Sequence, residues 1–226
     1  MSVSAIIVAA GAGRRLGSET PKQFIEIHSR PLVLYTLDKF LDARQVSEIV
    51  VVSARDWVDW LEERLPNASK PVSVVEGGLT RAESVFCGLS TVARNCTAVA
   101  IHDAARPFVA VKDIEATIQK ALETGAACLV GEVADSLKTV TYGEISATLD
   151  RSRIRRALTP QVFRTEIIRR AFALADFEQE IPDDSFLVEK LGYPVATVEA
   201  STVNLKVTYP EDLVLARLLL SEVPSL

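Results

Sequence analysis

The chain has 226 residues, of which 48% are hydrophobic and 24% are charged, and this composition is typical of a globular protein. Its formal net charge of −5 disfavours a nucleic-acid partner, because proteins that bind nucleic acids usually carry an excess of basic residues. Three cysteines without a CxxC pair and only two histidines disfavour a His/Cys zinc site and fit a reducing compartment. The first apolar run, residues 3–9, is too short to span a bilayer and follows no basic segment, so we expect a cytoplasmic protein without a membrane segment.

Short apolar runs alternate with stretches of helical period, which predicts an α/β fold. We expect one domain, residues 1–226, built on a single Rossmann-like, mostly parallel twisted sheet that is flanked by helices. The expected strands span residues 3–9, 48–53, 72–75, 98–102, 126–130 and 195–198, with a further strand near 203–207. The expected helices span residues 31–43, 56–65, 80–94, 111–124, 165–175 and 183–191, with a last helix after residue 210. A ligand site is expected at the carboxyl ends of the strands.

Residues 134–152 interrupt this alternation. Polar and apolar side chains alternate there without a helical face, which predicts a β-hairpin or projecting arm. Two interpretations remain open at this point, a solvated loop and an arm used for dimerisation.

A glycine-rich loop follows the first expected strand. Glycines after a strand let backbone N–H groups approach a negatively charged ligand closely. The spacing GxGxxxG does not match the dinucleotide fingerprint, and the loop lacks the GK[ST] end of a P-loop. It carries three cations instead, Arg14, Arg15 and Lys22, which could neutralise a triphosphate and its departing pyrophosphate. The alternative is a solvated turn whose arginines are incidental.

Two charged residues stand out at expected strands. Asp103 follows residues 98–102 directly, where a carboxylate could hold Mg²⁺ and bridge it to phosphates, although a plain turn residue is the alternative. Lys206 lies in the mostly apolar segment 203–207, and a lone half-buried lysine favours an anionic partner. A solvent-facing lysine on an edge strand is the alternative.

Five motifs in order, AAGAGRRLG…PKQF, GG…R…S, HDAARP, LTPQ and NLKVT, resemble those of the 2-C-methyl-D-erythritol 4-phosphate cytidylyltransferases of isoprenoid precursor biosynthesis. The resemblance runs from about Ser4 to Ala216. It implies an Mg²⁺-dependent nucleotidyltransferase that moves CMP from CTP onto the phosphate of a small sugar-alcohol phosphate. Two alternatives stay open, a ribitol 5-phosphate cytidylyltransferase, whose family shares much of the pattern, and an inactive CTP-binding module.

The resemblance also implies roles for residues at the matching positions. The expected catalytic residues are Arg15, Lys22, Arg151 and Lys206. The expected nucleotide-binding residues are Ala9, Ala10, Gly11, Gly78 and Ser84. The expected acceptor-binding residues are Asp103, Arg106, Ser136, Arg151, Thr159 and Lys206, and Asp103 is also the expected metal ligand. In the family an arm from a neighbouring subunit completes the acceptor site, so the resemblance implies a homodimer in which the arm supplies Ser136 and Arg151.

Two positions depart from the family pattern. Leu79 stands where members often carry an acidic residue, so a role for that side chain is not expected here. Pro182 stands where we expect a threonine that helps to bind the acceptor, and this departure bears on the acceptor's identity rather than on the reaction type.

Overall fold

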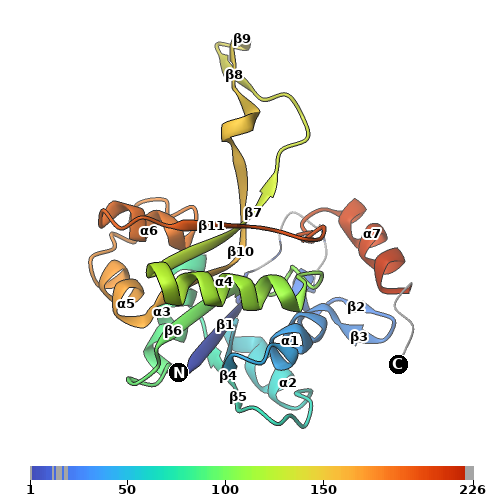
Figure 1. Ribbon diagram of the computed structural model, residues 1–226. Helices are drawn as coiled ribbons and strands as arrows, with labels where there is room; N and C mark the ends of the chain where they lie inside the picture. The colour runs from blue at the N-terminus through green and yellow to red at the C-terminus, as the bar shows by residue number, and fades with distance from the viewer. Residues whose placement is uncertain (1, 12, 14–16, 18–19, 222–226) are drawn as a thin grey trace.

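A central seven-stranded sheet organises the structure. The computed structural model describes residues 2–11, 13, 17 and 20–221 (Figure 1). The strand order is β11-β7-β10-β6-β1-β4-β5. Its strands are β1 (Val3–Ala9), β4 (Val46–Ser53), β5 (Val72–Glu76), β6 (Ala98–Asp103), β7 (Ala126–Glu132), β10 (Arg155–Arg164) and β11 (Ala196–Glu199). Neighbouring strands are parallel except where β10 pairs antiparallel with β6 and β7, so the expected mostly parallel sheet is confirmed.

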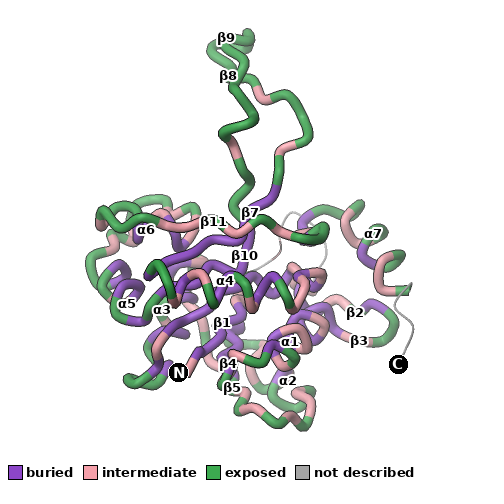
Figure 2. Tube along the Cα trace, in the orientation of Figure 1, coloured by how far each residue is buried: buried purple, intermediate pink, exposed green. Residues whose placement is uncertain are grey.

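Helices cover both faces of this sheet. They are α1 (Leu32–Asp42), α2 (Val58–Glu62), α3 (Arg81–Thr91), α4 (Val111–Thr124), α5 (Thr165–Ala173), α6 (Asp184–Lys190) and α7 (Pro210–Ser221). Successive residues of a strand point to opposite faces, and the core divides accordingly. Ala5 and Ile7 of β1 pack with residues of α1 and α4, whereas Ile6 packs with residues of α3, α5 and α6. Figure 2 shows the resulting contrast between the buried strands of the sheet and the exposed outer parts of the helices.

Most expected elements are present, with ends shifted by a few residues. The bounds of β1 and α4 match the expectation, and the expected capping box is formed by Thr80 and Glu83 at the start of α3. The expected helix at residues 56–65 is a 3-10 turn (Arg55–Trp57) followed by the short α2. Among residues 2–11, 13, 17 and 20–221, no helix combines the length and apolar character that crossing a bilayer requires.

Two parts of the sheet differ from the expectation. Strand β10 was not predicted, although it lies between β6 and β7 in the sheet. Proline cannot donate a ladder hydrogen bond, and the pairing of β10 with β7 is irregular between Ala157 and Gln161, the stretch that contains Pro160. The predicted strand near residues 203–207 is wrong, because this segment joins no sheet and contacts the loop after β6 through a hydrogen bond from the Val207 N–H to the Ala105 carbonyl at 2.8 Å.

Residues 134–152, which we call the arm, project away from the rest of the structure (Figure 1). The arm contains a two-stranded hairpin, β8 (Lys138–Thr141) and β9 (Glu144–Thr148). Its two-residue turn has Tyr142 at φ 52° and Gly143 at φ 85°, as a type I′ turn requires. Both strands are exposed along their whole length, including the apolar side chains of Val140 and Ile145. A shorter hairpin, β2 (Glu26–Ile27) and β3 (Arg30–Pro31), precedes α1.

A buried ion pair connects α3 to α6. Arg81 donates from Nη1 to Asp184 Oδ1 at 3.1 Å and from Nη2 to Asp184 Oδ2 at 2.8 Å. Asp184 has no exposed surface, so this two-pronged contact supplies the counter-charge that a buried carboxylate needs. The preceding residue, Asp183, caps α6 by accepting a hydrogen bond from the Phe186 N–H at 2.9 Å.

The substitution Asp184→Asn is expected to lower the free energy of unfolding by about 3 kcal/mol, because it leaves the Arg81 guanidinium without its counter-charge on α6. The matched control is Asp183→Asn, which should change stability by less than about 0.5 kcal/mol, since asparagine caps a helix as well as aspartate does. Urea denaturation of both variants measures the difference. Equal unfolding midpoints would show that the Arg81–Asp184 pair adds nothing to stability.

Candidate active site

The glycine-rich loop that follows β1 is closed at its base by a buried glutamine. Gln23, in the 3-10 turn η2 (Lys22–Phe24), donates from Nε2 to the carbonyl oxygens of Ala9 and Gly11. Gly13 has φ +65°, and a Cβ at this position would lie 2.9 Å from the backbone nitrogen of Lys22. Only glycine tolerates both constraints. The start of the loop and Lys22 are therefore held close together.

The turn after β5 packs against the start of this loop. A Cβ on Gly77 would lie 2.7 Å from Ala10 Cβ and 2.8 Å from Ser84 Oγ, so the close approach requires glycine at this position. The buried Ser84 hydroxyl lies 2.8 Å from the Thr80 carbonyl and 3.3 Å from the Gly78 carbonyl. Backbone from the ends of β1 and β5 is thus brought together, although β4 lies between the two strands in the sheet.

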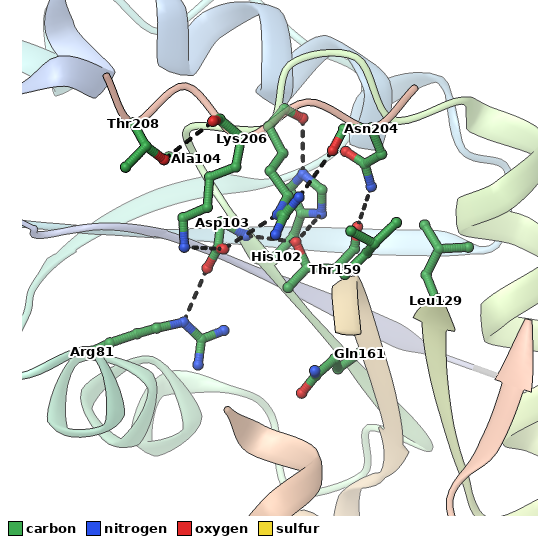
Figure 3. Close-up of polar contacts among 12 residues, drawn as sticks. Arg81, His102, Asp103, Ala104, Leu129, Thr159, Gln161, Asn204, Lys206 and Thr208 are labelled. Carbon is green, nitrogen blue, oxygen red and sulfur yellow. Dashed lines mark hydrogen bonds and ion pairs between the residues drawn. The ribbon is translucent and has the colours of Figure 1, made fainter. Parts of the chain in front are cut away.

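Asp103, at the end of β6, collects three cations from distant parts of the chain. Arg81 Nε lies 3.0 Å from its Oδ1, while Lys206 Nζ lies 2.8 Å and Arg106 Nε 3.4 Å from its Oδ2. Figure 3 shows Arg81 and Lys206 reaching the carboxylate from opposite sides. The carboxylate is the anionic partner of Lys206, and the contact is made from an irregular segment rather than from a strand.

These cations keep the Asp103 carboxyl group ionised. Burial favours the neutral form of a carboxyl group, but Arg81, Lys206 and Arg106 outweigh burial and hold the pKa of Asp103 well below its usual range. Burial alone would lower the pKa of Arg81, but the carboxylates of Asp184 and Asp103 outweigh it and raise that pKa. The cluster therefore brings three cationic side chains together with two carboxyl groups, and burial raises the pKa of Asp184 in spite of its contact with Arg81.

A hydrogen-bond network surrounds this cluster on its buried side. Thr159 of β10 places its Oγ1 3.0 Å from His102 Nδ1 and 3.2 Å from the Asp103 backbone nitrogen. His102 Nε2 lies 3.1 Å from the Arg106 carbonyl oxygen. Asn204 donates from its side-chain Nδ2 to the Thr159 carbonyl at 2.7 Å. Its backbone carbonyl accepts a hydrogen bond from Arg106 Nη1 at 2.9 Å. Burial lowers the pKa of His102 to about 4, so the ring is neutral at pH 7.

Apart from Lys22 in η2 and Arg15, the predicted site residues fall into three groups. One group gathers at the ends of β1 and β5 and at the start of α3, and it consists of Ala9, Ala10, Gly11, Gly78 and Ser84. Asp103, Arg106, Thr159 and Lys206 form a second group at the end of β6. The third group consists of Ser136 and Arg151 on the arm, where Arg151 donates a hydrogen bond to the Ala134 carbonyl. Arg15 lies outside the described residues.

Arg81 connects the first two groups, because it begins α3 directly after the turn of Gly77 and Gly78 and contacts Asp103 on β6. Sequence reasoning gave Arg81 no role, although the residue belongs to one of the five motifs. Gln23 and Asn204 were likewise part of motifs without an assigned role. His102 carried no usable signal, because the sequence does not show which partners its two nitrogens meet.

Asp103 is compatible with a divalent metal ion bound together with a phosphate. Among the described residues no group of three or more His, Cys, Asp or Glu side chains gathers to enclose a metal ion. Mg²⁺, however, is often held by one or two carboxylates, with substrate phosphates and water completing its ligands. Oδ1 of Asp103 contacts one cation, whereas Oδ2 contacts two. A carboxylate oxygen has two lone pairs, so Oδ1 keeps one for such an ion.

The geometry suits the binding of anions. Cationic side chains cluster at the carboxyl end of β6, and the glycine-rich loop follows the neighbouring strand β1, which pairs with β6 up to the Val8–Asp103 position. The departures from the family pattern lie outside this cluster: the Leu79 side chain is 99% exposed, and Pro182 is exposed next to the cap of α6.

Comparison with known proteins places this site in a family. The model of the family described as "IspD: 2-C-methyl-D-erythritol 4-phosphate cytidylyltransferase" matches residues 3–222. Proteins of that name from Rhodopirellula baltica and Thermotoga neapolitana are 41% and 40% identical to the chain, with 98% and 96% of this chain and 96% of each relative covered.

Solved structures agree with this assignment. A 4-diphosphocytidyl-2C-methyl-D-erythritol synthase from Anaerococcus prevotii superposes with a TM-score of 0.86 at 28% identity, covering 97% of this chain and 96% of its own. The 2-C-methyl-D-erythritol 4-phosphate cytidylyltransferase from Thermus thermophilus gives a TM-score of 0.78 at 34% identity, covering 97% and 98%. The chain therefore belongs to the 2-C-methyl-D-erythritol 4-phosphate cytidylyltransferase family, whose members are nucleotidyltransferases of isoprenoid biosynthesis.

Proposed function

We propose that this protein transfers CMP from CTP to 2-C-methyl-D-erythritol 4-phosphate and releases pyrophosphate. The observation that carries the proposal is the cationic cluster around Asp103, which lies beside a glycine-rich loop at the carboxyl ends of β1 and β6. Family membership supports the choice of CTP and of the methylerythritol phosphate as substrates. The domain that does this is the whole chain, with the arm as its only large projection among the described residues.

The nucleotide half of the site comprises the loop after β1 and the turn after β5. Backbone groups of Ala9, Ala10 and Gly11 would line the nucleotide, and Gly78 and Ser84 would contact the cytosine. The close packing of Gly77 on Ala10 and Ser84 supports this grouping, since it builds one continuous surface from two loops. Lys22, at the end of the glycine-rich loop, and Arg15 within it would stabilise the charge that develops on the triphosphate.

The acceptor half comprises the residues around Asp103. Lys206 and Arg106 would hold the acceptor phosphate, and Asp103 would keep both side chains in place. Thr159 lies in the same group, but its hydroxyl already contacts His102 and the backbone of Asp103, so it shapes the floor of the acceptor site.

The chemistry is an in-line displacement at phosphorus. An oxygen of the acceptor phosphate attacks the α-phosphorus of CTP and forms the new P–O bond. The bond from the α-phosphorus to the bridging oxygen breaks, and the pyrophosphate leaves with the electron pair. A phosphate monoester is already ionised near neutral pH, so no general base is required. The work left to the protein is to position two anions that repel each other and to neutralise the leaving group.

Mg²⁺ is the divalent ion we propose for this site, with Asp103 as its protein ligand. Such an ion would neutralise part of the charge on the phosphates. Arg81 and Lys206 would keep the Asp103 carboxylate ionised and oriented toward it.

We further propose that the protein acts as a homodimer in which the arm of one subunit reaches the acceptor site of the other through Ser136 and Arg151. The exposed apolar side chains of Val140 and Ile145 support this, because an isolated two-stranded hairpin is marginally stable in water and gains from a partner surface. The arm also projects away from the rest of its own subunit, which leaves it free to contact a second one (Figure 1).

The proposed reaction is tested by measuring pyrophosphate release with CTP, UTP or ATP in combination with 2-C-methyl-D-erythritol 4-phosphate or ribitol 5-phosphate. Turnover is expected with CTP and the methylerythritol phosphate. Faster turnover with ribitol 5-phosphate would replace the acceptor, and CTP binding without any turnover would show a binding module instead of an enzyme.

The variants Lys22→Ala and Arg15→Ala are each expected to reduce kcat by about 10²-fold or more, the usual effect of removing a fixed electrostatic contact to a developing charge. Steady-state kinetics with saturating CTP measures this effect. Lys120→Ala, on the surface of α4, removes a partly exposed cation and should leave kcat unchanged. Near-normal turnover of both loop variants would contradict the roles proposed for Lys22 and Arg15.

The variant Arg151→Ala is expected to raise the KM for the acceptor about 10-fold or more while the KM for CTP stays within about 3-fold, since the arm serves the acceptor half alone. Arg153→Ala is the matched control, because Arg153 is an exposed arginine of the 3-10 turn Arg151–Arg153 next to the arm's end. Sedimentation at assay concentrations establishes the oligomeric state of both variants. Acceptor kinetics that do not change in Arg151→Ala would argue against a role of the arm in the site.

A further inference from the structure

His102 is fully buried beside the proposed acceptor site and takes no direct part in the proposed transfer. Its ring lies at the end of β6, with the Phe40 ring centroid 4.9 Å away, and both of its nitrogens have polar partners. A buried imidazole with two engaged nitrogens has a defined orientation. The question is which nitrogen carries the proton.

The hydrogen-bond partners of the two ring nitrogens show which of them carries the proton. Nε2 lies 3.1 Å from the Arg106 carbonyl oxygen, and a carbonyl can only accept, so the proton is on Nε2. In a neutral ring the other nitrogen, Nδ1, is then an acceptor. The Thr159 hydroxyl, 3.0 Å away, donates to Nδ1, and its oxygen in turn accepts from the Asp103 N–H at 3.2 Å.

Three hydrogen bonds in one direction therefore connect the Asp103 backbone, Thr159, His102 and the Arg106 carbonyl. They fix both ends of the turn from Asp103 to Arg106, whose side chains meet at the Asp103 carboxylate. The Asn204 amide extends the network from the Thr159 carbonyl to the segment that carries Lys206. Arg106, in the loop after β6, and Lys206, in the 204–206 segment, are thus both connected to the same buried hydrogen-bond network.

We propose that His102 is a positioning residue for the transfer reaction, held in the Nε2–H tautomer, which sets the place of Asp103 through Thr159 and of Arg106 through its carbonyl. This inference rests on the proposed function, because the residues that it positions are those assigned to the acceptor phosphate and the metal. His102 touches neither substrate. Its contribution is to hold the cationic cluster in the geometry that the attack requires, where misplacement by about 1 Å can cost about 10²-fold in rate.

The tautomer is tested directly by nitrogen NMR of the imidazole at pH 7.5. The chain has only two histidines, so the variant His28→Asn leaves His102 as the single ring to observe. Asparagine tolerates the φ of 49° at position 28. The expected spectrum is that of a neutral ring protonated on Nε2. A proton on Nδ1 would reverse the direction of the network and overturn the proposal.

The positioning role is tested with three substitutions that separate the two bonds of the ring. His102→Asn places an amide near Nδ1 and can keep the bond from Thr159, whereas His102→Gln places one near Nε2 and can keep the bond to Arg106. His102→Leu keeps neither. We expect kcat to fall about 10- to 100-fold in His102→Leu and less in the two amide variants, with the KM for CTP within about 3-fold of the parent.

Circular dichroism at the assay temperature selects the variants that are folded, and kcat is compared among those. A folded His102→Leu variant with the parent's kcat would reduce His102 to a core residue and overturn the proposal. If His102→Leu does not fold, the tautomer measurement on His28→Asn still decides. An unmodified protein that fails to turn over CTP would refute the proposed function, and the NMR result would then stand on its own as a test of the network.

Discussion

The attraction between one carboxylate and three cations organises the site. Arg81, Arg106 and Lys206 come from α3, the loop after β6 and the segment before α7, and like charges so close together would repel one another without Asp103 between them. Because Asp103 ends the central strand β6, the sheet itself fixes where these charges meet. The cluster is therefore present before any substrate binds, and reorganisation during the reaction is kept small.

The sequence alone predicted the architecture, but it missed one strand and placed another where the structure has none. Uninterrupted apolar runs identified β1 and β6, since strands buried on both faces lack alternation. Strand β10 was missed because Pro160 and the charged pair Arg155 and Arg156 disguise it, and only its position between β6 and β7 makes it a strand. The segment at 203–207 was wrongly predicted as a strand, because a mostly apolar composition does not ensure that a segment pairs with a neighbouring strand.

Prediction of the site was limited because contacts between residues that are distant in the sequence depend on the fold. Motif spacing pointed to Asp103 and Lys206, and the structure places their charges 2.8 Å apart. Arg81 and His102 act through contacts with residues 22 and 57 positions away in the chain, and such pairs follow from the fold rather than from local pattern. The direction of a hydrogen-bond chain is likewise a property of assembled partners, so the role of Thr159 could be read only once both of its neighbours were in place.

The arm leaves and rejoins the sheet at paired residues, Glu132 on β7 and Arg155 on β10. Because Glu132 and Arg155 pair with each other, an insertion or deletion between them does not change the register of the seven-stranded sheet. Thr159 lies only four residues beyond that base, on the same strand. The arm can therefore change in length while Thr159 keeps its place in the sheet, so the geometry around Asp103 does not depend on how far the hairpin extends.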